Sequence, residues 1–428
     1  MKKIYIVSLG CPKNLVDTES ILFNFKKNGF EMVINENDAD YALINTCAFL
    51  KSAIKESDTV IKHFINLKKS KKIKKIFVAG CLVERFKDKI SLLYPEIDGF
   101  IGIGGYDKLL DFINSKKNFI SGDKTNIEFT SRIILTKPHS VYLKIADGCD
   151  NNCSYCTIPL IRGRFRSKRI EDILKEAKLL ALNGAKEISL IAQDTTGYGI
   201  DIYGEIKLLD LLKKLERIRG IKWIRLFYLY PSKIDIDLIK YISQNKKILH
   251  YIEMPIQHIS DKILRLMNRD YTSKDVYKTI DMIRKYIPDV SLRSSFIIGF
   301  PQESDSDFKK LISFINDVKF NYISFFKYSR ERKTLAFNIK NIVEKSKINE
   351  RYNIAINTYS RVLDNINKKL IGKVFEVVFD DKNWARSYMD GPDIDGRFFV
   401  SNYCAKPGEF KKVKVLKAQG YIREGIVL

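Results

Sequence analysis

Three cysteines lie within eight residues, in the segment Cys149-Asp-Asn-Asn-Cys153-Ser-Tyr-Cys156. Cysteine thiolates select iron–sulfur clusters, zinc or copper over harder cations. A cluster of four irons that is held by three thiolates keeps one iron without a protein ligand, and that iron can bind a small molecule. The nearest histidine, His139, precedes the strand that leads into this segment. We therefore expect Cys149, Cys153 and Cys156 to hold a 4Fe-4S cluster with one open iron.

The open iron suits the amino and carboxylate groups of S-adenosylmethionine (SAM). Tyr155, directly before the last cysteine, is placed to lie near the adenine of SAM. The alternative is a zinc site that takes a fourth ligand from far along the chain. Zinc motifs usually consist of two paired Cys-x-x-Cys or Cys/His halves, so a single triple with uneven spacing favours the cluster.

Three further cysteines, Cys11, Cys47 and Cys81, each follow an apolar run that predicts a buried strand. Strands are expected at 4–10, 41–46, 76–80 and 100–104, and helices at about 15–28 and 52–67. Alternating strands and helices predict a parallel sheet, in which ligands gather beyond the carboxyl ends of the strands. We therefore expect these cysteines to meet and hold a second 4Fe-4S cluster. The alternative is three buried structural thiols.

From residue 141 the alternation of strand and helix resumes and repeats six times. Strands are expected at 141–146, 187–192, 223–230, 250–254, 291–298 and 322–328. Six such units, with the cysteine segment after the first strand, predict a partial TIM-like (βα)6 barrel whose site lies at the carboxyl rim of the strands. Polar residues expected at this rim are candidates for contact with SAM or substrate: Gln193, Asp194, Gln257, His258 and Arg293. Each can equally be a loop hydrogen-bonder, and His258 a buried structural histidine.

The chain has 75 Lys and Arg against 51 Asp and Glu, a formal net charge of +24. This excess fits either an anionic partner such as RNA or a ribonucleoprotein, or a lysine-rich composition on solvated faces. The segment Arg162–Arg169 is strongly basic and suits a phosphate or an acidic residue of a protein substrate. The apolar run Ile4–Leu9 is too short for a secretory signal, and no stretch is as long as a membrane span. We expect a cytoplasmic protein with reduced thiols and no membrane contact.

The remaining segments complete an α/β chain of three predicted domains, at 1–125, 135–366 and 367–428. Residues 115–138 lack periodicity and predict a linker. Residues 334–369 predict a long, exposed helical connector. In the last segment, alternating residues at 374–379 and 410–416 predict a small β-barrel of the kind that binds nucleic acid or protein. Cys404 is solitary and receives no role.

With these motifs in place, the chain resembles the radical-SAM methylthiotransferases over essentially its full length. The motifs that carry the resemblance are Ser8–Asp17, Asn45–Phe49, Ala79–Cys81, Ile145–Cys156, Ile158-Pro159, Arg162-Gly163 and Pro255–His258. Gly10-Cys11-Pro-Lys-Asn14 is similar to the branch that modifies a ribosomal protein, whereas the tRNA branch, of the MiaB type, typically has Gly-Cys-Gln-Met-Asn. Gly391–Gly396 points the same way. Two rim loops, at 299–304 and 328–334, depart from the usual family patterns.

The resemblance implies a Rossmann-like N-terminal cluster domain, a radical-SAM barrel and a C-terminal TRAM barrel. It also implies two 4Fe-4S clusters, SAM and an electron donor, with no side chain that acts as catalytic acid or base. The implied reaction adds a methylthio group to the β-carbon of an aspartate in small-subunit ribosomal protein twelve, free or in the ribosome, with the TRAM barrel contacting that protein or RNA. Two alternatives stay open: a tRNA adenosine methylthiotransferase, and a non-catalytic RNA-binding protein with structural zinc.

Overall fold

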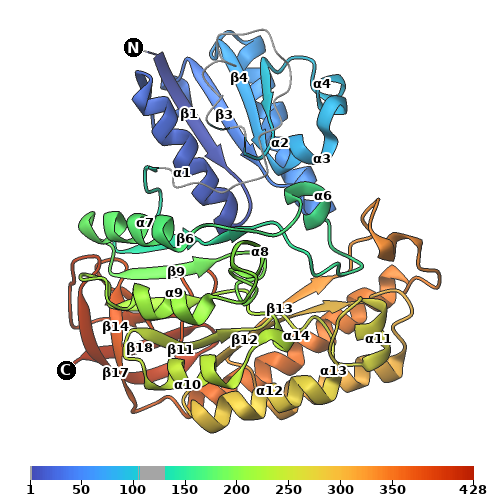
Figure 1. The fold of residues 1–428 in the computed structure, drawn as a ribbon, viewed down its shortest axis with the longest axis vertical. Coiled ribbons are helices and arrows are strands. Elements are labelled where there is room, and N and C mark those ends of the chain that lie inside the picture. The colour runs from blue at the N-terminus through green and yellow to red at the C-terminus, as the bar shows by residue number, and fades with distance from the viewer. Residues whose placement is uncertain (1, 105, 107–130) are drawn as a thin grey trace. The chain divides into compact units, whose positions relative to one another are not determined.

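The computed structural model describes residues 2–104, 106 and 131–428 and divides into two compact units (Figure 1). The first unit comprises Met1–Leu135, Lys144–Asp150 and Cys156–Glu176, and the second comprises Thr136–Leu143, Asn151–Tyr155 and Ala177–Leu428. The boundary passes twice through the cysteine segment, so that Cys149 and Cys156 belong to the first unit and Cys153 to the second. Most of the predicted linker, 115–130, lies outside the described residues.

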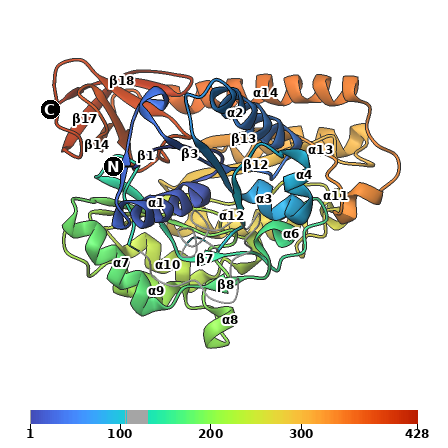
Figure 2. The same ribbon diagram turned by 90° about the horizontal axis from the view of Figure 1, so that it is seen from above.

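The first unit is built on a five-stranded parallel sheet with the order β2-β1-β3-β4-β5. The strands are β1 (Lys2–Ser8), β2 (Phe30–Met32), β3 (Tyr41–Thr46), β4 (Lys75–Gly80) and β5 (Gly99–Ile101). Helix α1 (Pro12–Lys27) packs Ile21 and Phe25 against one face, with Leu43. Helix α2 (Lys51–Lys69) packs Phe64 against the other, with Ile44. Figure 2 shows α1 and α2 on opposite sides of β1 and β3. The predicted parallel sheet is confirmed.

Shorter elements complete the first unit. They are the helices α3 (Cys81–Phe86), α4 (Ile90–Leu93) and α6 (Ile158–Arg162), and the antiparallel pair β7 (Ala146–Asp147) and β8 (Arg166–Ser167). Helix α7 (Ile170–Leu182) contributes residues to both units. The edge strand β2 was not predicted, because three residues are too few to show a periodic pattern.

The second unit holds a six-stranded sheet with the order β13-β12-β11-β10-β9-β6. Its strands are β6 (Ser140–Lys144), β9 (Glu187–Ile191), β10 (Trp223–Leu226), β11 (Ile248–Glu253), β12 (Ser291–Ile298) and β13 (Tyr322–Lys327). The pairings from β9 to β13 are all parallel. The intervening helices are α8 (Ile200–Tyr203), α9 (Leu208–Leu215), α10 (Ile236–Gln244), α11 (Asp261–Leu266), α12 (Ser273–Tyr286) and α13 (Asp305–Val318). The predicted partial barrel is confirmed.

The prediction that residues 334–369 form an exposed connector is wrong, because the helix in this segment packs against other elements of the second unit. Residues 334–369 form a short 3₁₀ turn, Leu335–Asn338, and the long helix α14 (Lys345–Lys368), which packs against α13 and β13. Ile348, Ala355, Tyr359 and Val362 are buried because they recur at helical spacing and form one apolar stripe. Across the described part of the chain, no helix is long and apolar enough to cross a membrane.

The C-terminal strands close into a small barrel with the order β14-β15-β16-β18-β17. They are β14 (Val374–Phe379), β15 (Trp384–Ser387), β16 (Arg397–Val400), β17 (Phe410–Gln419) and β18 (Ile422–Val427). The loop between β15 and β16 contacts the six-stranded sheet: Asp395 accepts hydrogen bonds from Tyr251 at 2.7 Å and from Arg293 at 3.0 Å. Ser291, the first residue of β12, donates to Met389. The segment 389–395 therefore fastens the barrel to the sheet within the second unit.

Candidate functional site

Cys11, Cys47 and Cys81 follow three neighbouring parallel strands of the first unit. Cys11 is the N-cap of α1, which begins at Pro12, a residue well suited to the first turn of a helix. Cys47 directly follows β3, and Cys81 directly follows β4 and opens α3. A Cβ added at Gly10, whose φ is +92°, would lie 2.9 Å from the Sγ of Cys47. The structure therefore brings these thiols to one edge of the sheet, as the sequence indicated.

The three thiols also lie within electrostatic reach of one another. Burial raises the pKa of the Cys81 thiol to about 12; the nearby Arg162 opposes the rise, while Cys11 and Cys47 add to it. Burial likewise raises the pKa of Cys47, with a further contribution from Cys11. Such thiols lose their protons when they bind a metal. The donor set fits an iron–sulfur cluster, although no three His, Cys, Asp or Glu side chains of the described residues converge on a site for a single metal ion.

Arg162 reaches Cys81 from the end of α6. Its side chain is 1% exposed, and one guanidinium nitrogen lies 3.7 Å from the Sγ of Cys81. The guanidinium donates to Asp147 at 2.8 Å and to Asp17 at 3.0 Å. It also donates to the side-chain oxygen of Asn14 at 3.3 Å. Arg162 therefore joins the helix that follows Cys11 to the segment that precedes Cys149.

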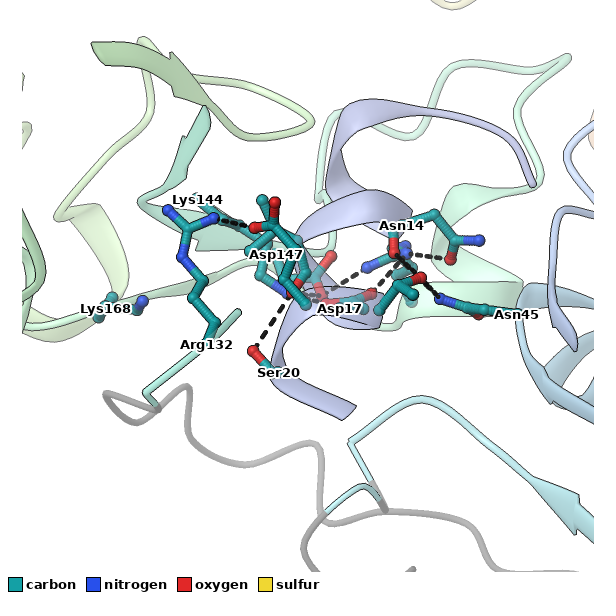
Figure 3. A network of polar contacts seen from close by, with 12 residues as sticks. Asn14, Asp17, Ser20, Asn45, Arg132, Lys144, Asp147 and Lys168 are labelled. Carbon is teal, nitrogen blue, oxygen red and sulfur yellow. Dashed lines mark hydrogen bonds and ion pairs between the residues drawn. The ribbon is translucent and has the colours of Figure 1, made fainter. Parts of the chain in front are cut away.

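Arg162 belongs to a larger buried set of eight charged residues, which we call the acid–base network. Its members are Asp17, Glu19, Arg132, Lys144, Asp147, Arg162, Lys168 and Glu176. Figure 3 shows Asp17, Lys144 and Asp147 lying close together. Four acidic and four basic side chains make the network neutral overall, which is the condition under which charges are tolerated in an interior.

The predicted anion site at Arg162–Arg169 is corrected by this network. Arg162 and Lys168 are buried and paired with carboxylates, so they are not available to a phosphate. Arg164 is exposed and pairs with Asp150 at 2.9 Å. Arg166 donates to the backbone carbonyl of Arg162. Two of the five basic residues of the segment, Arg162 and Lys168, thus serve internal ion pairs, which a count of local charge does not distinguish from a surface patch.

The cysteine segment is held by polar contacts on both sides of Cys153. In the first unit the backbone N–H of Cys149 donates to Gly163, and that of Ile158 donates to the Sγ of Cys156 at 3.4 Å. In the second unit Asn151 donates to Asp194 at 2.9 Å. Lys233 donates to Asp194 at 2.5 Å and to Asn151 at 2.9 Å. We call Asn151, Asp194 and Lys233 the loop latch, because these three side chains bond to one another.

Cys153 also has an arginine beside it. A guanidinium nitrogen of Arg269 lies 3.6 Å from the Sγ of Cys153. The same guanidinium lies 4.9 Å from the ring centre of Tyr230 and 5.6 Å from that of Tyr271. Arg269 and Lys233 were not singled out from the sequence. Nothing in the sequence around either residue marks it as a neighbour of the cysteine segment.

The structure also places the other residues that were predicted to contact SAM or substrate. Asp194, which is 2% exposed, belongs to the loop latch, and Gln193 precedes it on the same loop. The ring of Tyr155 packs edge-on against Phe300 at 6.5 Å, beside the apolar cluster at the end of α11. The backbone of Gln257 pairs with β12. The roles of Gln193, Asp194, Tyr155 and Arg293 toward SAM stay predictions.

His258 and Arg293 are both engaged in internal contacts. The Nδ1 of His258 accepts from the backbone N–H of Ser260 at 3.0 Å, so that Nε2 carries the hydrogen and faces Glu303 at 3.6 Å. This favours the structural alternative for His258. Arg293 was placed at the rim, which is wrong. It is the third residue of β12, lies within the sheet, and pairs with Glu253 at 2.9 Å and with Asp395.

Three family models match separate parts of the chain. The model described as "Uncharacterized protein family UPF0004" matches residues 3–102, that of the radical SAM superfamily matches 143–315, and that of the TRAM domain matches 371–422. Each match lies inside one of the three predicted domains. The domain boundaries between the matches stay predictions.

Solved structures support the same fold at low sequence identity. The radical SAM methyltransferase TsrM from Kitasatospora setae has a TM-score of 0.60 and 11% identity, over 78% of this chain and 77% of that one. The cobalamin-dependent SAM radical enzyme OxsB has a TM-score of 0.55 and 13% identity, over 86% of this chain and 61% of that one. At such identity the likeness concerns the fold alone.

Curated relatives match the chain from end to end. "Ribosomal protein uS12 methylthiotransferase RimO" of Elusimicrobium minutum is 47% identical over 100% of both chains. The proteins of the same name from Acetivibrio thermocellus and Clostridium botulinum are each 41% identical, and the alignments cover 100% and 99% of this chain and 98% of each relative. The chain therefore belongs to the RimO family of ribosomal protein uS12 methylthiotransferases.

Proposed function

We propose that this protein is a cytoplasmic radical SAM methylthiotransferase that modifies ribosomal protein uS12, replacing a hydrogen on the β-carbon of an aspartate with a methylthio group. One observation carries the proposal: the end-to-end identity of 47% to a protein named for this activity. The two cysteine triads support it, because a radical SAM enzyme without sulfur transfer needs only one of them.

The six cysteines divide into two ligand sets in this proposal. Cys149, Cys153 and Cys156 would hold a 4Fe-4S cluster that binds SAM, and Cys11, Cys47 and Cys81 would hold a second 4Fe-4S cluster. When bound, these groups supply the radical chemistry and the sulfur that an unactivated carbon requires. No side chain serves as catalytic acid or base, since none could usefully remove a proton from such a carbon at neutral pH. An external electron donor completes the set of partners.

The chain's own residues hold the segments that carry the cysteines in place. In the first unit the ion pairs of Arg162 with Asp17 and Asp147 fix the end of α6, which follows Cys156 in the chain. In the second unit the loop latch fixes the segment between Cys149 and Cys153. Cofactor sites depend on such supporting contacts, because they orient the ligands and exclude alternatives.

The C-terminal barrel is the proposed contact to the ribosomal substrate. Lys412, Lys414 and Lys417 of β17 are exposed, and Arg397 stacks on the ring of Trp384 at 3.9 Å on the neighbouring strands. Exposed cations and aromatic rings suit either ribosomal RNA or a protein bound to it. This contact would bring uS12, free or within the small subunit, to the enzyme.

Mass spectrometry of a deletion strain tests the substrate. The strain carries either this chain or its Cys149→Ala variant, and both uS12 and the tRNA nucleosides are analysed. We expect the intact chain to restore a methylthio group on an aspartate of uS12 and the variant to restore none. A methylthio group that returns on a tRNA adenosine instead would make the protein an enzyme of the MiaB type. Zinc in place of iron in the purified protein, with neither product, would make it a binding protein.

A further inference from the structure

The end of helix α11 is joined to the cysteine segment within the second unit. The backbone N–H and the hydroxyl of Ser154 donate to Met267 at 3.0 Å and to Leu266 at 2.7 Å. The side-chain amide of Asn268 donates to the carbonyl of Asn152 at 2.9 Å. Three hydrogen bonds thus hold the residues on either side of Cys153 against the end of this helix.

The same helix end presents Arg269 to Cys153. Asn268 has a φ of +55°, and the N–H of Arg269 donates to Leu264 at 2.9 Å, five residues earlier. This is the arrangement of a Schellman cap, which defines the direction in which the chain leaves a helix. The cap directs the Arg269 side chain toward Cys153. The position of the guanidinium therefore follows from the backbone and not from an ion pair.

The charge of Arg269 is not balanced by an acidic partner. One guanidinium nitrogen faces the Sγ of Cys153, and another donates to the carbonyl of Pro255 at 2.8 Å. Two tyrosine rings flank the group, and its Nε is buried without a hydrogen-bond partner. Among the residues that the structure describes, no carboxylate oxygen lies within ion-pair distance of Arg269. A buried donor without an acceptor is costly, so Arg269 keeps an unused hydrogen-bond donor and an uncompensated positive charge beside Cys153.

We propose that Arg269 is a positioning residue that raises the reduction potential of the cluster held by Cys149, Cys153 and Cys156. The inference rests on the proposed assignment of that cluster. A cluster with three thiolate ligands is anionic, and its reduction adds one more negative charge. A fixed, unbalanced cation beside one ligand stabilises the reduced form more than the oxidised form, and charges and hydrogen bonds at ligand sulfurs are known to set such potentials.

The test uses the full chain with Cys11, Cys47 and Cys81 replaced by alanine, so that one cluster remains. Iron and sulfide are measured first, and the midpoint potential is then followed by EPR of the reduced cluster. Arg269→Gln removes the charge. Arg269→Met also removes the charge and places a thioether between the tyrosine rings. It replaces the glutamine variant in the test if that variant does not fold. Arg269→Lys keeps the charge. Arg265→Gln is the matched control, because Arg265 is an exposed arginine of α11.

We expect both neutral variants to retain iron and to show a lower midpoint potential than the parent. The lysine variant and Arg265→Gln are expected to stay near the parent value. A neutral variant with the parent potential would overturn the proposal, and so would an equal fall in Arg269→Lys or Arg265→Gln. Absence of iron in the parent itself would instead overturn the cluster assignment, which separates the failure of the proposed function from the failure of this inference.

Discussion

Two arginines lie beside two different cysteines at nearly the same distance, yet in opposite electrostatic surroundings. Arg162 is 3.7 Å from the Sγ of Cys81, and Arg269 is 3.6 Å from that of Cys153. Arg162 is paired with Asp17 and Asp147, whereas Arg269 faces tyrosine rings and a carbonyl. The first arginine acts as a structural link whose charge is cancelled. The second leaves a positive charge next to its cysteine.

The largest expected effect follows from removing the balanced arginine. Arg162→Gln removes one of the two cations that face Asp17 and Asp147 and leaves them with Lys144 alone, which costs about 3–5 kcal/mol. We expect the opening free energy of the first unit, measured by hydrogen exchange at the amides of α1 and β7, to fall by that amount. Arg164→Gln, an exposed neighbour, is the control and is expected to change little. Equal effects of the two variants would show that the Arg162 ion pairs do not stabilise the unit.

A double-mutant cycle sharpens the account of Arg162. Asp147→Asn removes one of the two charges that Arg162 neutralises and keeps an oxygen for the N–H of Gly148. The double variant with Arg162→Gln is expected to be more stable than the sum of the single changes predicts, by about 2 kcal/mol, because coupled residues are not additive. The same exchange measurement checks this. Strict additivity would contradict a direct pairing of Arg162 with Asp147.

The carboxylate of the loop latch, Asp194, pairs with Lys233 and not with Arg269. The contribution of this pair to stability can also be tested. Asp194→Asn removes a buried charge that accepts from Lys233 and Asn151, at an expected cost of about 2 kcal/mol. Hydrogen exchange at residues 151–155 should become faster. Ser232→Ala, which affects a neighbouring but exposed hydrogen bond, is the control. Unchanged exchange in Asp194→Asn would mean that other contacts hold the segment.

The smallest expected effect on stability is that of the unbalanced arginine. Arg269→Gln loses the contacts with two tyrosine rings and a carbonyl but leaves no carboxylate unpaired. The expected loss of stability is therefore about 1 kcal/mol. Exchange at the amides after α11 measures it, with Arg265→Gln as control. A loss as large as that of Arg162→Gln would remove the contrast between the two arginines.

The strands that precede Cys11, Cys47 and Cys81 could be predicted because the signals for them are local. Apolar runs mark β1, β3 and β4, and each cysteine stands at or just past the end of its run. The partners of these cysteines could not be predicted in the same way. Arg162 and Asp17 are 145 residues apart, and Arg269 and Cys153 are 116 apart. Pairings over such distances leave no trace in a window of sequence.

Two features were misplaced, for different reasons. Residues 345–368 carry an apolar stripe that was underrated among many charges, although its helical spacing was visible. Arg293 was assigned to the carboxyl rim of the strands, yet it lies near the start of β12, and its partner Asp395 comes from the C-terminal barrel, 102 residues later. Polar residues in strands serve contacts between sheets as readily as cofactor sites.

The central claim is that each cysteine triad holds its own four-iron cluster. Iron and sulfide content after anaerobic reconstitution tests it most directly, in the wild-type chain and in the variants that replace either triad with alanine. We predict about eight irons per chain in the wild type and about four in each variant. Four irons in the wild type, falling to none without Cys149, Cys153 and Cys156, would contradict the claim and leave Cys11, Cys47 and Cys81 as structural thiols.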